Sequence, residues 1–218
     1  MNNYITLYGE VLGYPNQVSV DKRGKAYYSF SLAAERVSGI KDIVQILVEE
    51  GTPAFKSLVE IDQKKDLLET KLLITGRIRT RLLRVKESSR LQISVRAQEI
   101  KEQEYEGDNN GVVMTAFVCK VGELRTTPRG IRITDLILAC WREDGSGVSD
   151  YIPAVTWNGT AVRASENLKV GDCIELRGRL QSREYTKEQE NGETEVRTCY
   201  ELSIEKFEKA KMPEKKES

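Results

Sequence analysis

The stretch DYIPAVTWNGTAVRASENLKVGDCIELRGRLQSREY, residues 150–185, decides the fold of the second half of the chain. Its first part alternates apolar and polar residues and predicts a strand over Tyr151–Trp157. A short helix is expected over Thr160–Leu168. The turn Val170-Gly171-Asp172 then leads into a long strand over Cys173–Tyr185. The stretch therefore predicts strand, helix and strand in succession.

Further strands are predicted on both sides of this stretch. Val113–Val121 and Ile131–Ala139 precede it, and Val196–Phe207 follows it after the hairpin-turn pair Asn191-Gly192. Five strands with one helix between the third and fourth are the order of an OB-fold, a five-stranded Greek-key barrel.

The first half of the chain repeats this order. GKAYYSFSLAAER from Gly24 aligns with GIRITDLILACWR from Gly130, and LLITGRIRTR with Gly76 aligns with IELRGRLQSR with Gly178. A repeat of this size indicates two copies of one small domain. The first-copy strands are expected over Tyr4–Leu12, Tyr27–Ala34, Ile43–Val48, Lys71–Leu83 and Leu91–Ile100, with a helix that Thr52 caps and Pro53 begins.

The sequence thus predicts an all-β protein of two tandem five-stranded OB-fold barrels, each with one helix between strands 3 and 4. The domain boundaries that we expect are a first barrel over 1–104, a linker over 105–111, a second barrel over 112–210 and a disordered tail over 211–218.

The amino-acid composition restricts the classes of protein to which this chain can belong. A hydrophobic content of 39% with 31% charged residues is typical of a soluble globular chain, and no apolar run is long enough for a membrane helix. The N-terminus alternates like a strand and lacks a signal segment, so the cytoplasm is expected. The 34 basic and 34 acidic residues cancel, which argues against a polycation that coats duplex DNA.

Nothing in the sequence indicates an enzyme or a cofactor. There is no histidine, no phosphate-binding loop and no GxSxG motif. No cysteines form a CxxC pair, so no metal site is expected, and we interpret the cysteines as small, mostly buried strand residues with free thiols. They are Cys119, Cys140, Cys173 and Cys199. A nuclease that uses scattered carboxylates stays open as an alternative.

The second copy contains several motifs in a fixed order. They begin at GELRTTPRG (residues 122–130), with its Pro-x-Gly pair, and continue through ITDLILACWRE. A third strand that ends in an aromatic residue followed by Asn-Gly comes next, and then a Gly-Arg-Leu-x-x-Arg strand that ends in another aromatic residue. In this combination the second copy resembles a bacterial or phage-type single-stranded DNA-binding protein. The resemblance implies sequence-nonspecific binding of single-stranded DNA in replication, recombination or repair.

The family stacks bases on four aromatic positions, which are all aromatic here: Trp141, Tyr151, Trp157 and Tyr185. An exposed ring holds any base, because every base has a π-face. Trp141 precedes a polar loop, so we expect it to be exposed. The pattern leaves both core burial and exposure open for Trp157.

Arginines accompany these rings. Arg177, Arg179 and Arg183 alternate toward Tyr185 and predict a phosphate track on one face of a strand, although a solvated outer face would show the same pattern. The other candidate phosphate contacts are Arg125, Arg142, Arg77, Arg79 and Arg81.

The first copy departs from the family pattern. It has Glu35, Ile43, Glu49 and Leu82 or Leu83 at the four ring positions. We therefore expect it to be a scaffold and assembly domain, with weak electrostatic binding as a second role.

The resemblance also bears on partners. It implies a homodimer that presents four OB-folds. The acidic tip with which the family often recruits replication and repair proteins is absent from this sequence. Two alternative functions stay open: an OB-fold adaptor similar to primosomal replication protein N, and a binder of single-stranded RNA.

Overall fold

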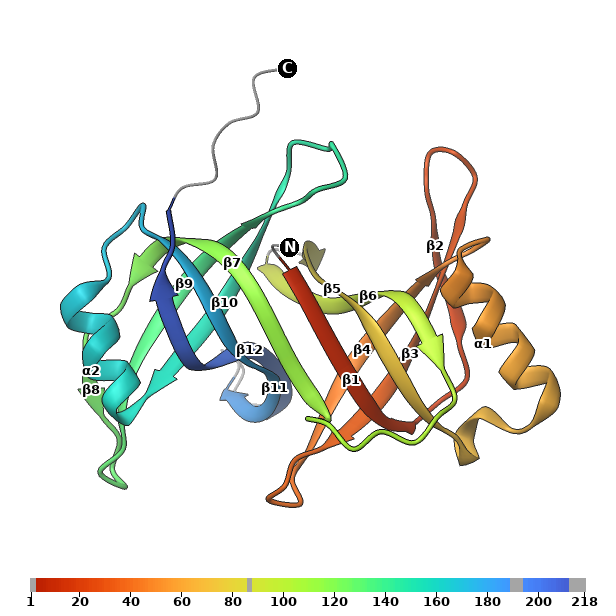
Figure 1. Cartoon of the computed structure of the whole chain (residues 1–218), viewed down its shortest axis with the longest axis horizontal. Helices are drawn as coiled ribbons and strands as arrows, with labels where there is room; N and C mark the ends of the chain where they lie inside the picture. Colours follow the sequence, from red (N-terminus) through yellow and green to blue (C-terminus); the bar gives the residue numbers. More distant parts are fainter. Residues whose placement is uncertain (1–2, 86–87, 189–193, 212–218) are drawn as a thin grey trace. The chain divides into compact units, whose positions relative to one another are not determined.

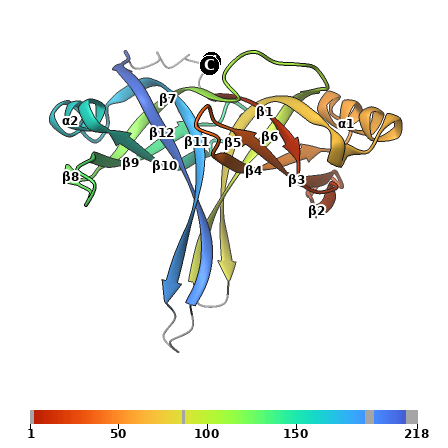
Figure 2. The same cartoon turned by 90° about the horizontal axis from the view of Figure 1, so that it is seen from below.

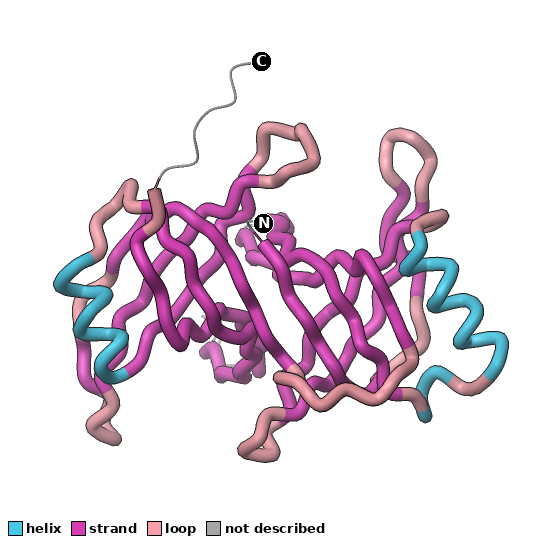
Figure 3. The backbone as a smooth tube through the Cα atoms, in the orientation of Figure 1, coloured by secondary structure: helices cyan, strands magenta, loops and turns pink. Residues whose placement is uncertain are grey.

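A computed structural model describes residues 3–85, 88–188 and 194–211, and side chains near the tips of two long hairpins are excluded. Most of the described chain is strand, with one α-helix in each half (Figure 3). No helix in these residues is long and apolar enough to cross a membrane.

The first half folds as a barrel, as the sequence predicts (Figure 1). The strands are paired in the order β2-β3-β4-β6-β5-β1, and the pairing of β1 with β3 closes the barrel. The strands β4 and β6 are parallel and the other pairs are antiparallel. The elements are β1 (Asn3–Val11), β2 (Asn16–Val20), β3 (Ala26–Glu35), β4 (Lys41–Glu49), α1 (Pro53–Lys64), η1 (Leu67–Glu69), β5 (Lys71–Val85) and β6 (Ser88–Lys101).

The second half has the same topology. Its strands are paired in the order β7-β11-β12-β10-β9-β8, β7 also pairs with β9, and β10 runs parallel to β12. Its elements are β7 (Asn110–Val121), β8 (Arg125–Thr126), β9 (Arg132–Trp141), β10 (Ser149–Trp157), α2 (Asn158–Asn167), β11 (Cys173–Glu188) and β12 (Thr194–Lys209). The prediction of two OB-fold barrels is confirmed.

Each helix follows the third long strand of its barrel. The hydroxyl of Thr52 accepts a hydrogen bond from the amide of Phe55 and caps α1, and Pro53 occupies its first turn. In the second barrel, Asn158 adopts a left-handed backbone conformation, with a φ of 49°, which Asn tolerates better than most residues. The chain therefore turns into α2 immediately after Trp157.

The aligned glycines of the two long strands have a shared packing reason. A Cβ atom on Gly178 would lie 2.1 Å from the carbonyl oxygen of Ser203, and one on Gly76 would lie 2.4 Å from that of Arg96. Only glycine lets the neighbouring backbone approach so closely. Aliphatic side chains fill the core of each barrel, among them Ile5, Leu7, Leu32, Ile46 and Ile74 in the first and Met114, Leu136, Leu138, Ile152 and Ile174 in the second.

The chain forms two compact units whose limits cut through the long hairpin of β11 and β12. One unit contains Tyr4–Gly111 together with Leu180–Glu201, and the other contains Val112–Arg179 together with Leu202–Ser218. Figure 2 shows this hairpin as an arm that extends past the other strands of its barrel. The predicted hairpin turn Asn191-Gly192 lies outside the described residues.

Candidate nucleic-acid interface

Two of the predicted stacking rings lie together on one face of the second barrel. In the antiparallel pair of β9 and β10, Tyr151 is opposite Ala139 and Trp141 is opposite Ser149. The two rings are therefore diagonal neighbours on the same face, with Cα atoms roughly 7–8 Å apart. Trp141 is 54% exposed and Tyr151 is 55% exposed. The exposure that the sequence predicts for Trp141 is observed.

Trp157 lies on the same face at the other end of β10. It is six residues from Tyr151, a distance of about 20 Å along an extended strand. The ring is half-buried, and its Nε1 donates a hydrogen bond of 2.9 Å to the hydroxyl of Ser203, a buried residue of β12. One edge of the indole is thus fixed, while the residue keeps part of its surface in contact with solvent.

Arginines and acids face one another across β11 and β12. Arg179 Nη1 lies 3.4 Å from Glu205 Oε1, and Arg183 Nε lies 3.5 Å from Glu201 Oε1. Gln181 also donates to Glu201, at 2.8 Å. The column of guanidinium groups that the alternation predicts is therefore present, but carboxylates on the neighbouring strand balance part of its charge.

The remaining candidates on this strand are Arg177 and Tyr185. Arg177 is exposed and borders a shallow hollow floored by Phe207 and Leu176. The side chain of Tyr185 lies outside the described residues.

The two other arginines of the second barrel are each paired with an aspartate. Arg125 Nη2 lies 2.6 Å from Asp135 Oδ2 at an exposed position beside the short strand β8. Arg142 makes two hydrogen bonds to Asp150, whose side chain is 0% exposed. These hydrogen bonds raise the pKa of Arg142, and burial opposes them only in part. Asp135, Asp150 and Ser203 are not among the residues that the sequence predicts for the site.

The ring positions of the first barrel hold different chemistry, as their sequence indicates. Glu49 stands where the second barrel has Trp157, and it is buried and forms ion pairs with Lys25, at 3.0 Å, and with Arg96. Arg96 occupies the strand position of Ser203, because Leu47 pairs with Arg96 as Val155 pairs with Ser203. The guanidinium of Arg96 also lies 5.6 Å from the centre of the Tyr27 ring. In the first barrel, the ion pairs of Glu49 thus take the place of the Trp157 indole and the Ser203 hydroxyl.

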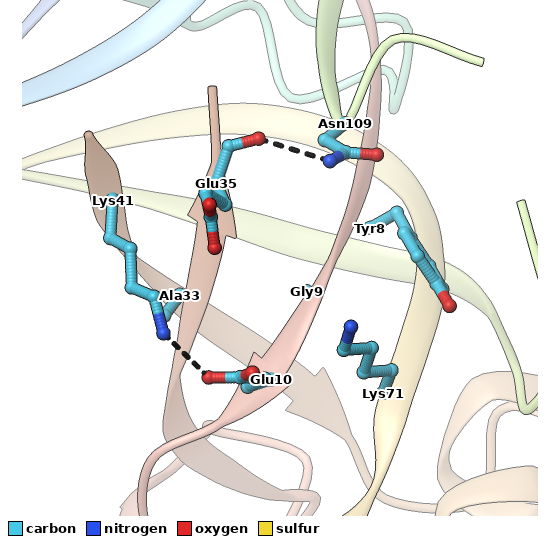
Figure 4. Close-up of a pocket in the computed structure, with 8 residues that line it drawn as sticks. All are labelled: Tyr8, Gly9, Glu10, Ala33, Glu35, Lys41, Lys71 and Asn109. Atoms are coloured by element: carbon cyan, nitrogen blue, oxygen red, sulfur yellow. Dashed lines mark hydrogen bonds and ion pairs between the residues drawn. The ribbon is translucent and has the colours of Figure 1, made fainter. Parts of the chain in front are cut away.

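The position equivalent to Trp141 borders a polar hollow. Figure 4 shows Glu35 in this hollow, with Lys41 beside Glu10 and with Lys71 nearby. Lys41 and Glu10 form an ion pair at 2.8 Å, which lowers the pKa of Glu10 and raises the pKa of Lys41. The opposite charges in the hollow balance one another, so it shows no preference for an anion.

The basic strand β5 supplies the three candidate arginines of the first barrel. Arg77 and Arg79 are half-buried, and Arg81 is exposed. Arg77 is directly opposite Arg96 in the pairing of β5 with β6. Like charges at paired positions repel each other, and the ion pair of Arg96 with Glu49 offsets part of this repulsion.

The described residues also include potential metal-ligating side chains and cysteine thiols. No cluster of three or more metal-ligating side chains occurs among them. All four cysteines are free thiols, two buried and two half-buried, and burial raises the pKa of Cys173 and of Cys199. The neutral thiol is therefore the favoured form at these two positions.

Known proteins share this sequence pattern. Residues 109–209 match the model of the Single-strand binding protein family. The chain is 36% identical over 84 residues to "Single-stranded DNA-binding protein A" of Bacillus subtilis, a match that covers 37% of this chain and 49% of that protein. It is 34% identical over 84 residues to "Single-stranded DNA-binding protein 1" of Streptococcus pyogenes, with coverage of 37% and 65%. The chain thus spans between about half and two thirds of these relatives.

Comparison with solved structures extends the likeness of the fold to both barrels. The crystal structure of wild-type single-stranded DNA binding protein from Thermus aquaticus superposes with a TM-score of 0.73. The match covers 99% of this chain and 96% of that chain, at 19% sequence identity. The shared fold therefore includes the first barrel, to which the family model does not extend. Residues 109–209 thus resemble the single-strand binding protein family in sequence, and both barrels resemble the Thermus aquaticus protein in fold.

Proposed function

We propose that this protein binds single-stranded DNA without sequence preference, by stacking bases on rings of the second barrel and pairing phosphates with arginines. The observation that carries the proposal is the exposure of Trp141 and Tyr151 on the face that also holds Trp157. An exposed ring can stack on any base, because every base has a π-face. The family match of residues 109–209 and the names of the relatives support the same conclusion.

The expected binding energy follows from the number of rings. Each stacked base contributes about 1–3 kcal/mol when judged by truncation of the ring. The ordering of the strand and of the arginine side chains opposes this gain. The three described rings would together contribute a gross ~3–9 kcal/mol, from which this ordering cost is subtracted.

We further propose that the two barrels have different functions. The second barrel, residues 112–210, would bind the strand, and the first, residues 1–104, would serve as scaffold and assembly domain. The ion pairs of Glu49 at the position of Trp157 support this division. The resemblance to the family supports a homodimer with four OB-folds that acts in the cytoplasm in replication, recombination or repair, as a binding protein rather than an enzyme. The linker and tail boundaries remain predictions.

The test uses the two tryptophans of the chain, both of which lie on the proposed face. Titration with oligo-dT is expected to quench their fluorescence, and the affinity should fall as salt rises, by about 0.7 logarithmic units per phosphate neutralised. A variant with Trp141→Ala and Trp157→Ala should bind much more weakly, as measured by anisotropy of a labelled oligonucleotide. Parent-like affinity of that variant would refute the stacking model.

The alternatives make different predictions. A protein-interaction adaptor would have its rings buried in the core or capped by another subunit. Trp141 and Tyr151 are more than half exposed in the chain, and the relatives are named single-stranded DNA-binding proteins, so this function is not favoured. Binding of RNA uses the same stacking chemistry. Competition between matched DNA and RNA oligonucleotides distinguishes the two ligands.

A further inference from the structure

In the sequence, the two residues that adjoin the exposed rings of the second barrel, Arg142 and Asp150, form an ion pair. Trp141 precedes Arg142 in the chain, and Tyr151 follows Asp150. Arg142 Nε lies 3.0 Å from Asp150 Oδ2, and Arg142 Nη2 lies 2.6 Å from Asp150 Oδ1. The amide of Arg142 also donates to the carbonyl of Val148, which closes the loop between β9 and β10. The pair thus joins the ends of the two strands that carry the rings.

The direction of the side chains separates this pair from the stacking face. Successive residues of a strand point to opposite faces of a sheet. Asp150 therefore points away from the face that presents Tyr151, in agreement with its complete burial. The guanidinium of Arg142 follows the carboxylate to that side and is itself only 22% exposed.

We propose that Arg142 and Asp150 are positioning residues that hold Trp141 and Tyr151 for stacking, and that Arg142 does not contact phosphate. The inference rests on the proposed function. A planar guanidinium that bonds both oxygens of a carboxylate fixes its orientation as well as its distance. A buried aspartate must stay paired, so the guanidinium is not available to an incoming strand.

The first barrel provides an internal comparison. Arg36 and Asp42 form an equivalent pair, with Arg36 Nε 2.7 Å from Asp42 Oδ2 and with Asp42 fully buried. The flanking residues there are Glu35 and Ile43, which are not aromatic. The ion pair is therefore a feature of this hairpin in both barrels, and only the second barrel uses it beside rings.

The first test is the Arg142→Lys variant. Lysine keeps the charge but cannot bond both carboxylate oxygens. If Arg142 positions the rings, the affinity for oligo-dT falls about tenfold, as when one ring no longer stacks, while the salt dependence of binding stays as in the parent. Arg36→Lys, the matched control, should bind like the parent. Parent-like affinity of Arg142→Lys would overturn the proposal.

A second variant removes the guanidinium without leaving a buried charge unpaired. In Arg142→Gln with Asp150→Asn, two amides replace the ion pair and the net charge is unchanged. A phosphate contact at Arg142 predicts that the salt slope decreases by about 0.7 in this variant, and that result would overturn the proposal. Positioning predicts weaker binding with an unchanged slope.

A third readout needs no DNA. In a Trp157→Phe background, the remaining indole is Trp141, and its fluorescence anisotropy reports how firmly the ring is held. We expect lower anisotropy for Arg142→Lys than for its parent. If the parent fails to bind oligo-dT, the proposed function is wrong, and this measurement still decides whether the ion pair positions Trp141. Unchanged anisotropy would overturn the positioning role.

Discussion

Tyr151 is the ring whose contribution to binding can be separated most clearly from its contribution to folding. It is 55% exposed and lies on the open face of β10. The Tyr151→Ala variant should lose about 1–3 kcal/mol of binding free energy for oligo-dT, a factor of roughly 5 to 150. Its thermal midpoint should stay near that of the parent, because surface substitutions change stability little. Anisotropy titration and thermal unfolding measure the two quantities.

Tyr14 of the first barrel is the matched control for this substitution. It is 50% exposed, and its hydroxyl donates to Asp66 at 2.8 Å. Tyr14→Ala removes as much exposed ring surface but should leave DNA affinity unchanged. An equal loss of affinity in both variants would show that the effect of Tyr151 is not local stacking.

At the level of single residues, the sequence predicted the exposure of Trp141 but not the contacts that hold the rings in place. The exposure of Trp141 followed from the polar loop after it, whereas the half-burial of Trp157 depends on Ser203, which comes from a distant strand. The pairing of Arg142 with Asp150 also requires the loop to fold back. An arginine and an aspartate recur at matching positions of both copies, and in the first copy they are Arg36 and Asp42. This recurrence could have predicted the ion pair.

Among the elements, the start of β11 and the end of β12 are joined by Asp172. Its carboxylate accepts a hydrogen bond from Lys209 Nζ, at 2.8 Å, and another from the amide of Lys169. The Lys209 bond is the main reason why the pKa of Asp172 is lowered. A lowered folded-state pKa stabilises the fold above the ordinary aspartate value of about 4, and this stability is lost as pH falls through the folded-state pKa.

The Asp172→Asn variant should therefore unfold at a lower urea concentration than the parent at neutral pH. The difference should shrink as the pH decreases below about 4, because the parent then loses the same charge. Asp62→Asn, an exposed change on α1, is the control. A difference between Asp172→Asn and parent that persists undiminished to pH 2 would contradict this account.

The parallel pairs β4–β6 and β10–β12 allow the stacking site to be moved from one barrel to the other. In the first barrel, Glu49→Trp with Arg96→Ser reproduces the side chains of Trp157 and Ser203 at corresponding strand positions. We expect the new indole to be quenched by oligo-dT and the affinity to rise about fivefold or more, the effect of one added stack. The Arg96→Ser variant alone, as control, should not gain affinity. A new indole that does not respond to DNA would show that the first barrel lacks a path for the strand.

The long elements were predictable and the short ones were not. The alternation of apolar residues predicted the long strands, and Thr52 with Pro53 predicted the start of α1. The edge strands β2 and β8 were missed. β2 has a register irregularity between Gln17 and Ser19, and β8 has only two residues, so neither shows a regular period.

At the scale of the whole molecule, the internal repeat predicted two barrels but not the limits of the compact units. The outer part of the β11–β12 hairpin groups with the first barrel, and Asp42 shows one reason. This buried carboxylate accepts hydrogen bonds from Arg36, from Asn110 and from the amide of Ser182. The internal repeat reflects the contacts that both copies share. It therefore cannot predict the contacts that only one copy makes.

The electrostatics of the whole molecule lead to a last prediction. The net charge is +0, and Glu205 and Glu201 lie against two of the candidate phosphate contacts, Arg179 and Arg183. Phosphates must compete with these carboxylates. Glu201→Gln with Glu205→Gln should therefore raise the affinity for oligo-dT, and the salt dependence should steepen by about 0.7 for each arginine that gains a phosphate.

The control for this double variant has the same change in net charge on the first barrel. Glu60 and Glu99 are exposed, and Glu99 pairs with Lys101 at 3.0 Å. Glu60→Gln with Glu99→Gln raises the general attraction for DNA, which changes affinity through the long-range field and is screened by salt. Only the release of Arg179 and Arg183 adds new phosphate contacts. The salt dependence of binding should therefore steepen more in Glu201→Gln with Glu205→Gln than in the control. Equal slopes in the two would show that the strand does not follow β11.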